Sequence, residues 1–102
     1  MYQAVLCSHP SHARAMVNLG NLRFRAGKIE DARMLYQHAR TCDPMLPEAA
    51  YNLGYLALEE GELSDALNLL EIAVKLDPTF DDAKFNLEVA KQRASRAMGE
   101  SR

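Results

Sequence analysis

The sequence predicts an all-α fold in which pairs of helices repeat along the chain. Residues 13–46 align without a gap to residues 47–80, and twelve of the 34 aligned pairs are identical. Apolar residues within each repeat recur at helical spacing, and glycine and Asp-Pro pairs punctuate both repeats at the same places. Self-similarity at a fixed period of this length is typical of a helical solenoid.

The first half of the repeat is predicted to be a helix. Ala15, Leu19, Leu22 and Ala26 follow one another at spacings of four, three and four residues. Such spacing places side chains on one stripe of an α-helix. We therefore expect this stripe to be the apolar face of the first helix.

The second half of the repeat is predicted to be another helix, because apolar residues continue at the same spacing. They are Ile29, Ala32, Leu35, Ala39 and Cys42. Gly27 and its equivalent Gly61 fall between the two helices, where glycine can adopt a positive φ without steric cost. Small residues at Gly20 and Ala32 suit a close approach of the paired helices.

Proline ends each second helix. Asp43-Pro44 and Asp77-Pro78 follow the apolar pattern, and proline can neither continue a helix nor tolerate a helical residue before it. We predict one domain over 1–102: the end of a truncated repeat at 1–10, repeats at 13–46 and 47–80, a capping helix at 81–98 and a tail at 99–102. Glu88 replaces the repeats' glycine in the last helix, which suits a helix with a solvated outer face.

Composition excludes several functional classes. The chain has 102 residues and a net charge of −2, which argues against a nucleic-acid binder, and its apolar runs are too short to span a membrane. Phosphate-binding glycine loops and nucleophile motifs are missing, so we expect no enzyme and no cofactor. His38 and Cys42 are two potential ligands, too few for a metal site. Two cysteines and no signal peptide favour a cytoplasmic protein.

The repeat resembles the tetratricopeptide repeat over essentially the whole chain. Matching features are the Leu-Gly pair of the first helix and the later alanines and proline, namely Leu19-Gly20, Leu53-Gly54, Ala32, Ala66, Ala39, Ala73, Pro44 and Pro78. The departures are Met16 and Ala50 for a common Trp, Arg23 and Ala57 for a Tyr, and Leu70 for an aromatic residue. The resemblance implies a right-handed superhelix of antiparallel helix pairs, with a concave groove lined by the first helices.

The resemblance also implies a binding site for another protein or a peptide. Asn18, Asn52 and Asn86 recur at 34-residue spacing and would form a row along the groove. An asparagine amide offers both a donor and an acceptor, so it can hold a peptide backbone. The flanking groove positions are Asn21, Tyr51, Tyr55, Phe85 and Val89.

One subtype of the family is not expected. Members that bind the acidic C-terminal tails of heat-shock chaperones combine two asparagines with three basic residues. Asn21 and Asn52 match by register, but Val17, Asp82 and Asn86 occupy the basic positions. Two carboxylates would find no cation there.

Self-assembly is the alternative function. We expect Tyr2, Val5 and Leu6 to belong to a second helix whose first helix is absent, which makes them a candidate self-association edge. Residues 1–46 carry six basic and three acidic side chains, a charge of +3, and residues 47–80 carry one and seven, a charge of −6. Opposed charges of this kind favour head-to-tail stacking or a preferred ligand direction.

Overall fold

The computed structural model describes residues 10–100, and these residues form helices joined by short turns. The elements are α1 (Pro10–Arg25), α2 (Ile29–Cys42), α3 (Pro47–Glu59), α4 (Leu63–Leu76) and α5 (Asp81–Glu100). The described residues contain no strand. The prediction of an all-α fold is therefore confirmed.

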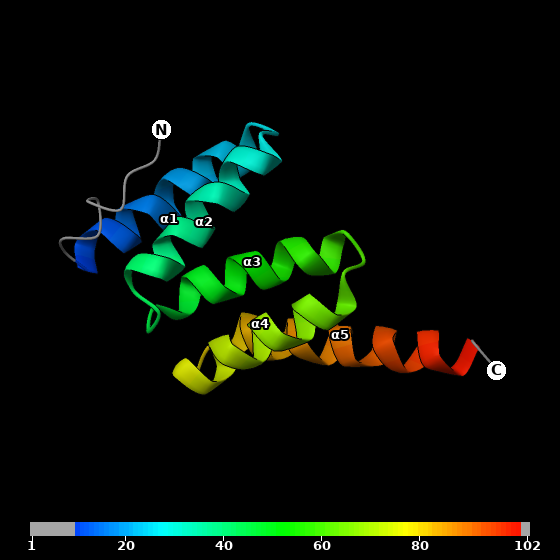
Figure 1. The fold of residues 1–102 in the computed structure, drawn as a ribbon. Coiled ribbons are helices and arrows are strands. Elements are labelled where there is room, and N and C mark those ends of the chain that lie inside the picture. Colours follow the sequence, from blue (N-terminus) through cyan, green and yellow to red (C-terminus); the bar gives the residue numbers. More distant parts are fainter. Residues whose placement is uncertain (1–9, 101–102) are drawn as a thin grey trace.

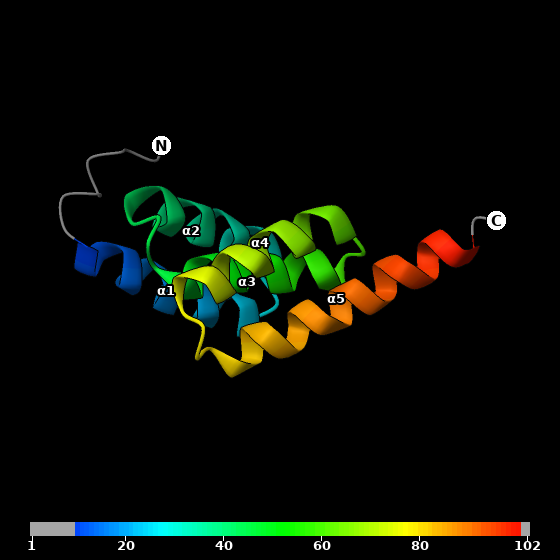
Figure 2. The same ribbon diagram turned by 90° about the horizontal axis from the view of Figure 1, so that it is seen from below.

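Helices that follow one another along the chain pack together. Figure 1 shows α1 beside α2 and α3 beside α4, and each of these pairs is in contact, as are α2 with α3 and α4 with α5. Smaller contacts join α1 to α3 and α3 to α5. Figure 2 shows α5 extending along the α3–α4 pair. The result is a helix-pair solenoid in which the first helices α1, α3 and α5 are neighbours.

The turns use the residues that the sequence predicts. Gly27 and Gly61 adopt φ values of 82° and 80°, in the left-handed region that favours glycine. The second helices end at Cys42 and Leu76, just before the Asp-Pro pairs. The carboxylate of Asp77 then accepts hydrogen bonds from the backbone N–H and the hydroxyl of Thr79, at 3.0 and 2.6 Å. These bonds lower the pKa of Asp77 and fix the turn that leads into α5.

A glycine lies at the contact between the two helices of each pair. A Cβ atom added at Gly20 would lie 2.6 Å from Cε1 of Tyr36, and one added at Gly54 would lie 2.9 Å from Cγ of Leu70. Ala32 is fully buried in the same hairpin as Gly20. The expected close approach of the paired helices is confirmed.

The predicted apolar stripe of the first helix is exposed in α1. Leu19 and Leu22 are 39% and 58% exposed, Ala15 is exposed, and Ala26 lies beyond the end of the helix. The face that α1 buries instead consists of Ala13, Met16, Val17 and Gly20.

The physical reason is that this stripe packs on the second helix of the preceding repeat in α3 and α5, and no described helix precedes α1. The equivalent positions in the next two first helices are buried because a second helix packs on them. They are Ala49, Leu53 and Leu56 in α3, against α2, and Ala83, Leu87 and Ala90 in α5, against α4. By contrast, the predicted stripe of the second helix is confirmed. Ala32, Leu35 and Ala39 are buried, and the partly buried Ile29 and Cys42 pack against the core.

An ion pair connects the two helix pairs. Arg33 of α2 donates hydrogen bonds to Glu30 in its own helix and to Glu60 at the end of α3. These two carboxylates raise the pKa of Arg33, and the guanidinium in turn lowers the pKa of Glu30. The pairing adds a polar contact between α2 and the end of α3, beside the apolar core that these helices share.

Candidate functional site

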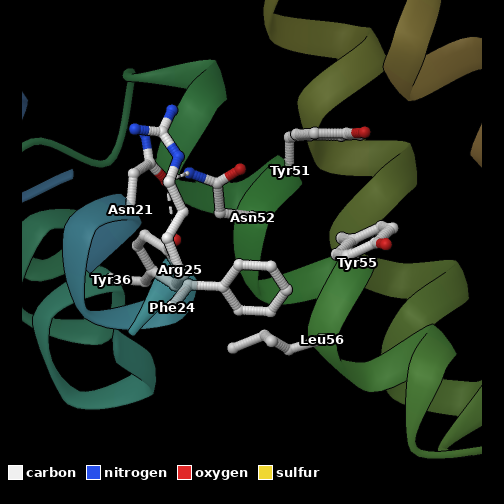
Figure 3. A pocket seen from close by; sticks show the side chains of 8 residues that line it. All are labelled: Asn21, Phe24, Arg25, Tyr36, Tyr51, Asn52, Tyr55 and Leu56. Atoms are coloured by element: carbon white, nitrogen blue, oxygen red, sulfur yellow. Dashed lines mark hydrogen bonds between the residues drawn. The ribbon is translucent and has the colours of Figure 1, made fainter. Parts of the chain in front are cut away.

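A pocket of about 370 Å³ lies between the first two helix pairs. Its lining combines aromatic, amide and guanidinium side chains: Asn21, Phe24 and Arg25 from α1, Tyr36 from α2, and Tyr51, Asn52, Tyr55 and Leu56 from α3. Figure 3 shows these side chains grouped where α1 approaches α3. A concave surface with apolar walls and a few polar groups is the usual form of a binding site.

Asn21 organises the polar wall of the pocket. Its Oδ1 accepts a hydrogen bond of 2.7 Å from the hydroxyl of Tyr36 and another of 3.2 Å from Nδ2 of Asn52. One amide oxygen thus connects α1 to both α2 and α3. Within the described residues, neither Nδ2 of Asn21 nor Oδ1 of Asn52 forms a hydrogen bond. Both groups therefore remain available to a ligand.

A second polar contact joins α3 to α5. Nδ2 of Asn86 donates a hydrogen bond of 2.9 Å to the hydroxyl oxygen of Tyr51. This bond and the Asn21–Asn52 bond connect half-buried polar side chains of α1, α3 and α5 into one surface. We call the surface of α1, α3 and α5 that carries these residues the first-helix face.

Aromatic rings form a row along the first-helix face. The rings of Phe24 and Tyr55 meet edge to face at a centroid distance of 6.1 Å, and those of Tyr55 and Tyr51 lie 6.4 Å apart. Phe80, in the turn before α5, continues the row at 4.8 Å from Tyr51. Aromatic side chains of this kind offer large contact area with few rotatable bonds.

Burial and two charges shape the chemistry of the tyrosine hydroxyls. Burial raises the pKa of Tyr36, and the nearby positive charge of Arg25 partly offsets this rise. Burial also raises the pKa of Tyr51, the negative charge of Asp82 raises it further, and the hydrogen bond from Asn86 opposes both. A cation and an anion therefore act on different tyrosines of the same face.

The predicted asparagine row does not have three equivalent members. Asn18 is exposed and makes no side-chain hydrogen bond within the described residues, whereas Asn52 and Asn86 are half-buried and each donates to a preceding first helix. Phe85 is 68% exposed, and Val89 of α5 packs against the core that α5 shares with α3 and α4. The predicted edge residues Tyr2, Val5 and Leu6 lie outside the described residues.

Sequence reasoning missed four residues that line the pocket. They are Phe24, Arg25, Tyr36 and Leu56. The sequence could have indicated Tyr36, because it is the one tyrosine, phenylalanine or tryptophan of α2 and its ring packs against Gly20 of the same hairpin. Leu56 belongs to the apolar stripe of α3, so its position marks the junction with the preceding repeat.

The described residues hold neither a cluster of metal-ligating side chains nor a helix that could span a membrane. No group of three or more His, Cys, Asp or Glu side chains gathers in residues 10–100 in a way that could hold a metal ion. Within the same range, no helix combines the length and apolar character needed to cross a bilayer.

Comparison with known protein families agrees with the geometry. Two family models described as tetratricopeptide repeat match the chain, one over residues 1–47 and the other over residues 47–80. No curated protein matches the chain significantly. Repeats of this type are non-enzymatic modules that generally mediate protein–protein interactions. The period of the sequence, the paired helices and the matches to both halves of residues 1–80 show that this chain belongs to the tetratricopeptide repeat family.

Proposed function

We propose that this chain is a non-catalytic scaffold whose first-helix face binds an extended segment of a partner protein. The observation that carries the proposal is the pocket between α1 and α3, where half-buried tyrosines lie beside amide groups that have hydrogen-bonding capacity left. Apolar side chains of the segment would contact the rings, and its backbone would bond to the amides of Asn21 and Asn52.

The affinity of such a site is modest. The row of rings is short, and an extended segment loses conformational freedom when it binds. We expect a dissociation constant on the order of micromolar, as for small transient interfaces.

The test compares two sets of asparagine substitutions in a pull-down from native lysate. The triple variant Asn18→Ala, Asn52→Ala, Asn86→Ala removes the row, and Asn68→Ala removes an exposed asparagine of α4 outside the first-helix face. Helicity of both variants is measured first by circular dichroism. A partner retained by the control variant and lost by the triple variant supports the proposal, and a partner retained by both refutes it.

Self-assembly is the second candidate function. The observation in its favour is the apolar stripe of α1, because Leu19 and Leu22 are exposed while their equivalents Leu53 and Leu56 are 7% and 3% exposed. A second copy could cover this stripe together with the predicted edge, and the opposed charges of the repeats would then steer the approach.

Sedimentation over a range of protein concentrations tests self-assembly. We expect a concentration-dependent mass that Leu22→Glu or Leu6→Glu abolishes. Met45→Glu is the matched control, because Met45 is 70% exposed and lies in the turn before α3. A constant monomer mass at high concentration excludes this function.

A further inference from the structure

Arg25 places a positive charge at one end of the aromatic row. It lines the pocket next to Phe24, at the end of α1, and it is exposed. No carboxylate within the described residues forms an ion pair with it. Its charge nevertheless acts on the hydroxyl of Tyr36 inside the site. Arg25 can therefore attract a negative group on a bound segment.

Asp82 places a negative charge at the other end of the row. It lies in the first turn of α5 and is exposed. Its neighbour Asp81 pairs with Lys84 at 3.4 Å, whereas Asp82 forms no ion pair within the described residues. Asp82 lies four residues before Asn86, on the same face of α5, and Asn86 bonds to the hydroxyl of Tyr51. The negative charge of Asp82 accordingly raises the pKa of Tyr51. Asp82 can therefore attract a positive group on the same segment.

The rings between these charges determine how many residues of a bound segment lie between its two charged side chains. Two steps, of 6.1 Å from Phe24 to Tyr55 and 6.4 Å from Tyr55 to Tyr51, separate the ring next to Arg25 in the chain from the ring whose pKa Asp82 raises. An extended chain advances about 3.3 Å per residue, so the two steps together span at most about four residues. Apolar side chains of the segment would lie over the rings in this interval.

We propose that the first-helix face selects an extended segment with an acidic side chain near Arg25 and a basic side chain near Asp82, about four residues apart and with apolar residues between them. This inference rests on the proposed function and adds the chemistry and the orientation of the ligand. Opposite charges at the two ends favour one alignment of the segment, because the reverse alignment places like charges together.

Selection from random peptides tests the charge pattern. The probe is a library of random twelve-residue peptides displayed on phage as an internal insert, so that neither peptide terminus is exposed. The immobilised proteins are the wild type, Arg25→Glu, Asp82→Lys and the triple asparagine variant. Matched controls are Arg23→Glu, outside the pocket on α1, and Asp65→Lys, exposed on α4.

The wild type should enrich peptides with one acidic and one basic residue about four positions apart. Arg25→Glu should shift the enrichment to peptides with two basic residues, and Asp82→Lys to peptides with two acidic residues, while both controls keep the wild-type pattern. For a recovered peptide measured by fluorescence anisotropy, replacing either charged residue with glutamine should weaken binding about two- to fivefold, the range of an exposed ion pair.

The other outcomes separate this inference from the proposed function. Peptides that depend on the asparagine row but show no charge pattern leave the proposed function standing and overturn the inference. Peptides that the triple variant retains, or no enrichment at all, overturn both. A parallel library with an exposed C-terminus identifies recognition of a terminal carboxylate, and enrichment only in that library also overturns the inference.

Discussion

Replacing Gly20 with alanine tests the close packing that supports the site. The added Cβ would lie 2.6 and 2.9 Å from two carbons of the Tyr36 ring, Cε1 and Cδ1. Carbon atoms are in contact without strain only at about 3.5–4.0 Å. Tyr36 is 3% exposed, so its rigid ring cannot move aside into solvent. The helices must separate, or the ring must tilt.

The size of the effect follows from three contributions. Overpacking a core typically costs ~1–3 kcal/mol. Alanine in place of glycine in a helix interior stabilises by ~1 kcal/mol, which opposes this cost. A tilted ring would also weaken the hydrogen bond from Tyr36 to Asn21, with a further loss of ~0.5–1.5 kcal/mol. We expect Gly20→Ala to lower the free energy of unfolding by about 1–3 kcal/mol.

Urea unfolding followed by circular dichroism measures this change. Gly99→Ala is the matched control, because Gly99 is also in a helix but a Cβ added there would meet nothing within 4 Å. The control should leave stability unchanged or raise it by up to ~1 kcal/mol. If Gly20→Ala is as stable as the wild type, the reasoning about this contact is wrong.

A double-mutant cycle identifies the ring as the cause. In the second hairpin, the flexible side chain of Leu70 packs against Gly54. Tyr36→Leu copies that arrangement in the first hairpin, so Gly20→Ala should cost less in this background than in the wild type. The expected coupling is about 0.5–2 kcal/mol, and additive costs would assign the destabilisation to something other than the ring.

Three further predictions concern a turn, the tyrosines and the ion pair. Gly27→Ala should lower the free energy of unfolding in urea by about 1–2 kcal/mol, because Gly27 has a φ of 82° and alanine is strained there; an unchanged value contradicts this. The pKa values of Tyr36 and Tyr51 are raised in the folded protein, so the free energy of unfolding stays constant below the ordinary pKa of 10.0 and falls as pH rises above it. The absorbance of tyrosinate should therefore show a second titration phase at higher pH, and Tyr51→Phe should reduce that phase. A single phase at the ordinary pKa contradicts this. A double-mutant cycle on Arg33 and Glu60 should give a coupling of ~0.3–1 kcal/mol in urea unfolding that decreases with added salt, whereas a salt-independent coupling would exclude an ionic origin.

The turns and helices could be predicted because local chemistry determines them. Gly27 and Gly61 supply the positive φ that each turn needs, and proline after Asp43 and Asp77 ends each second helix. These constraints act within a few residues. They are therefore visible in the sequence without knowledge of the packing.

The buried face of α1 could not be read from its own residues. Leu19 and Leu53 occupy equivalent positions and are both leucines, yet Leu19 is 39% exposed and Leu53 is 7% exposed. The difference arises because α2 packs on α3, whereas no described helix packs on the corresponding stripe of α1. Residue type and helical spacing identify a stripe, but a neighbouring repeat decides whether it is buried.

The hydrogen-bond partners of the site's asparagines could not be predicted from residue type and spacing either. Asn52 and Asn86 occupy equivalent positions, but Asn52 donates to Asn21, which is 31 residues earlier, and Asn86 donates to Tyr51, which is 35 residues earlier. Position 55, the equivalent of Asn21, is a tyrosine whose ring packs between those of Phe24 and Tyr51. The repeat period predicts where the asparagines lie, and the flanking residues that differ between repeats determine their partners.

This inequivalence has a consequence for recognition. An amide–amide hydrogen bond joins α1 to α3, whereas an amide–phenol hydrogen bond joins α3 to α5. The charges of Arg25 and Asp82 at the two ends have opposite sign. A face built of identical repeats would offer a segment several registers of equal energy. Here a shift by one repeat would exchange amide for phenol contacts and move an acidic side chain away from its cation. The departures from the repeat, more than the repeat itself, would therefore fix the register of a bound segment.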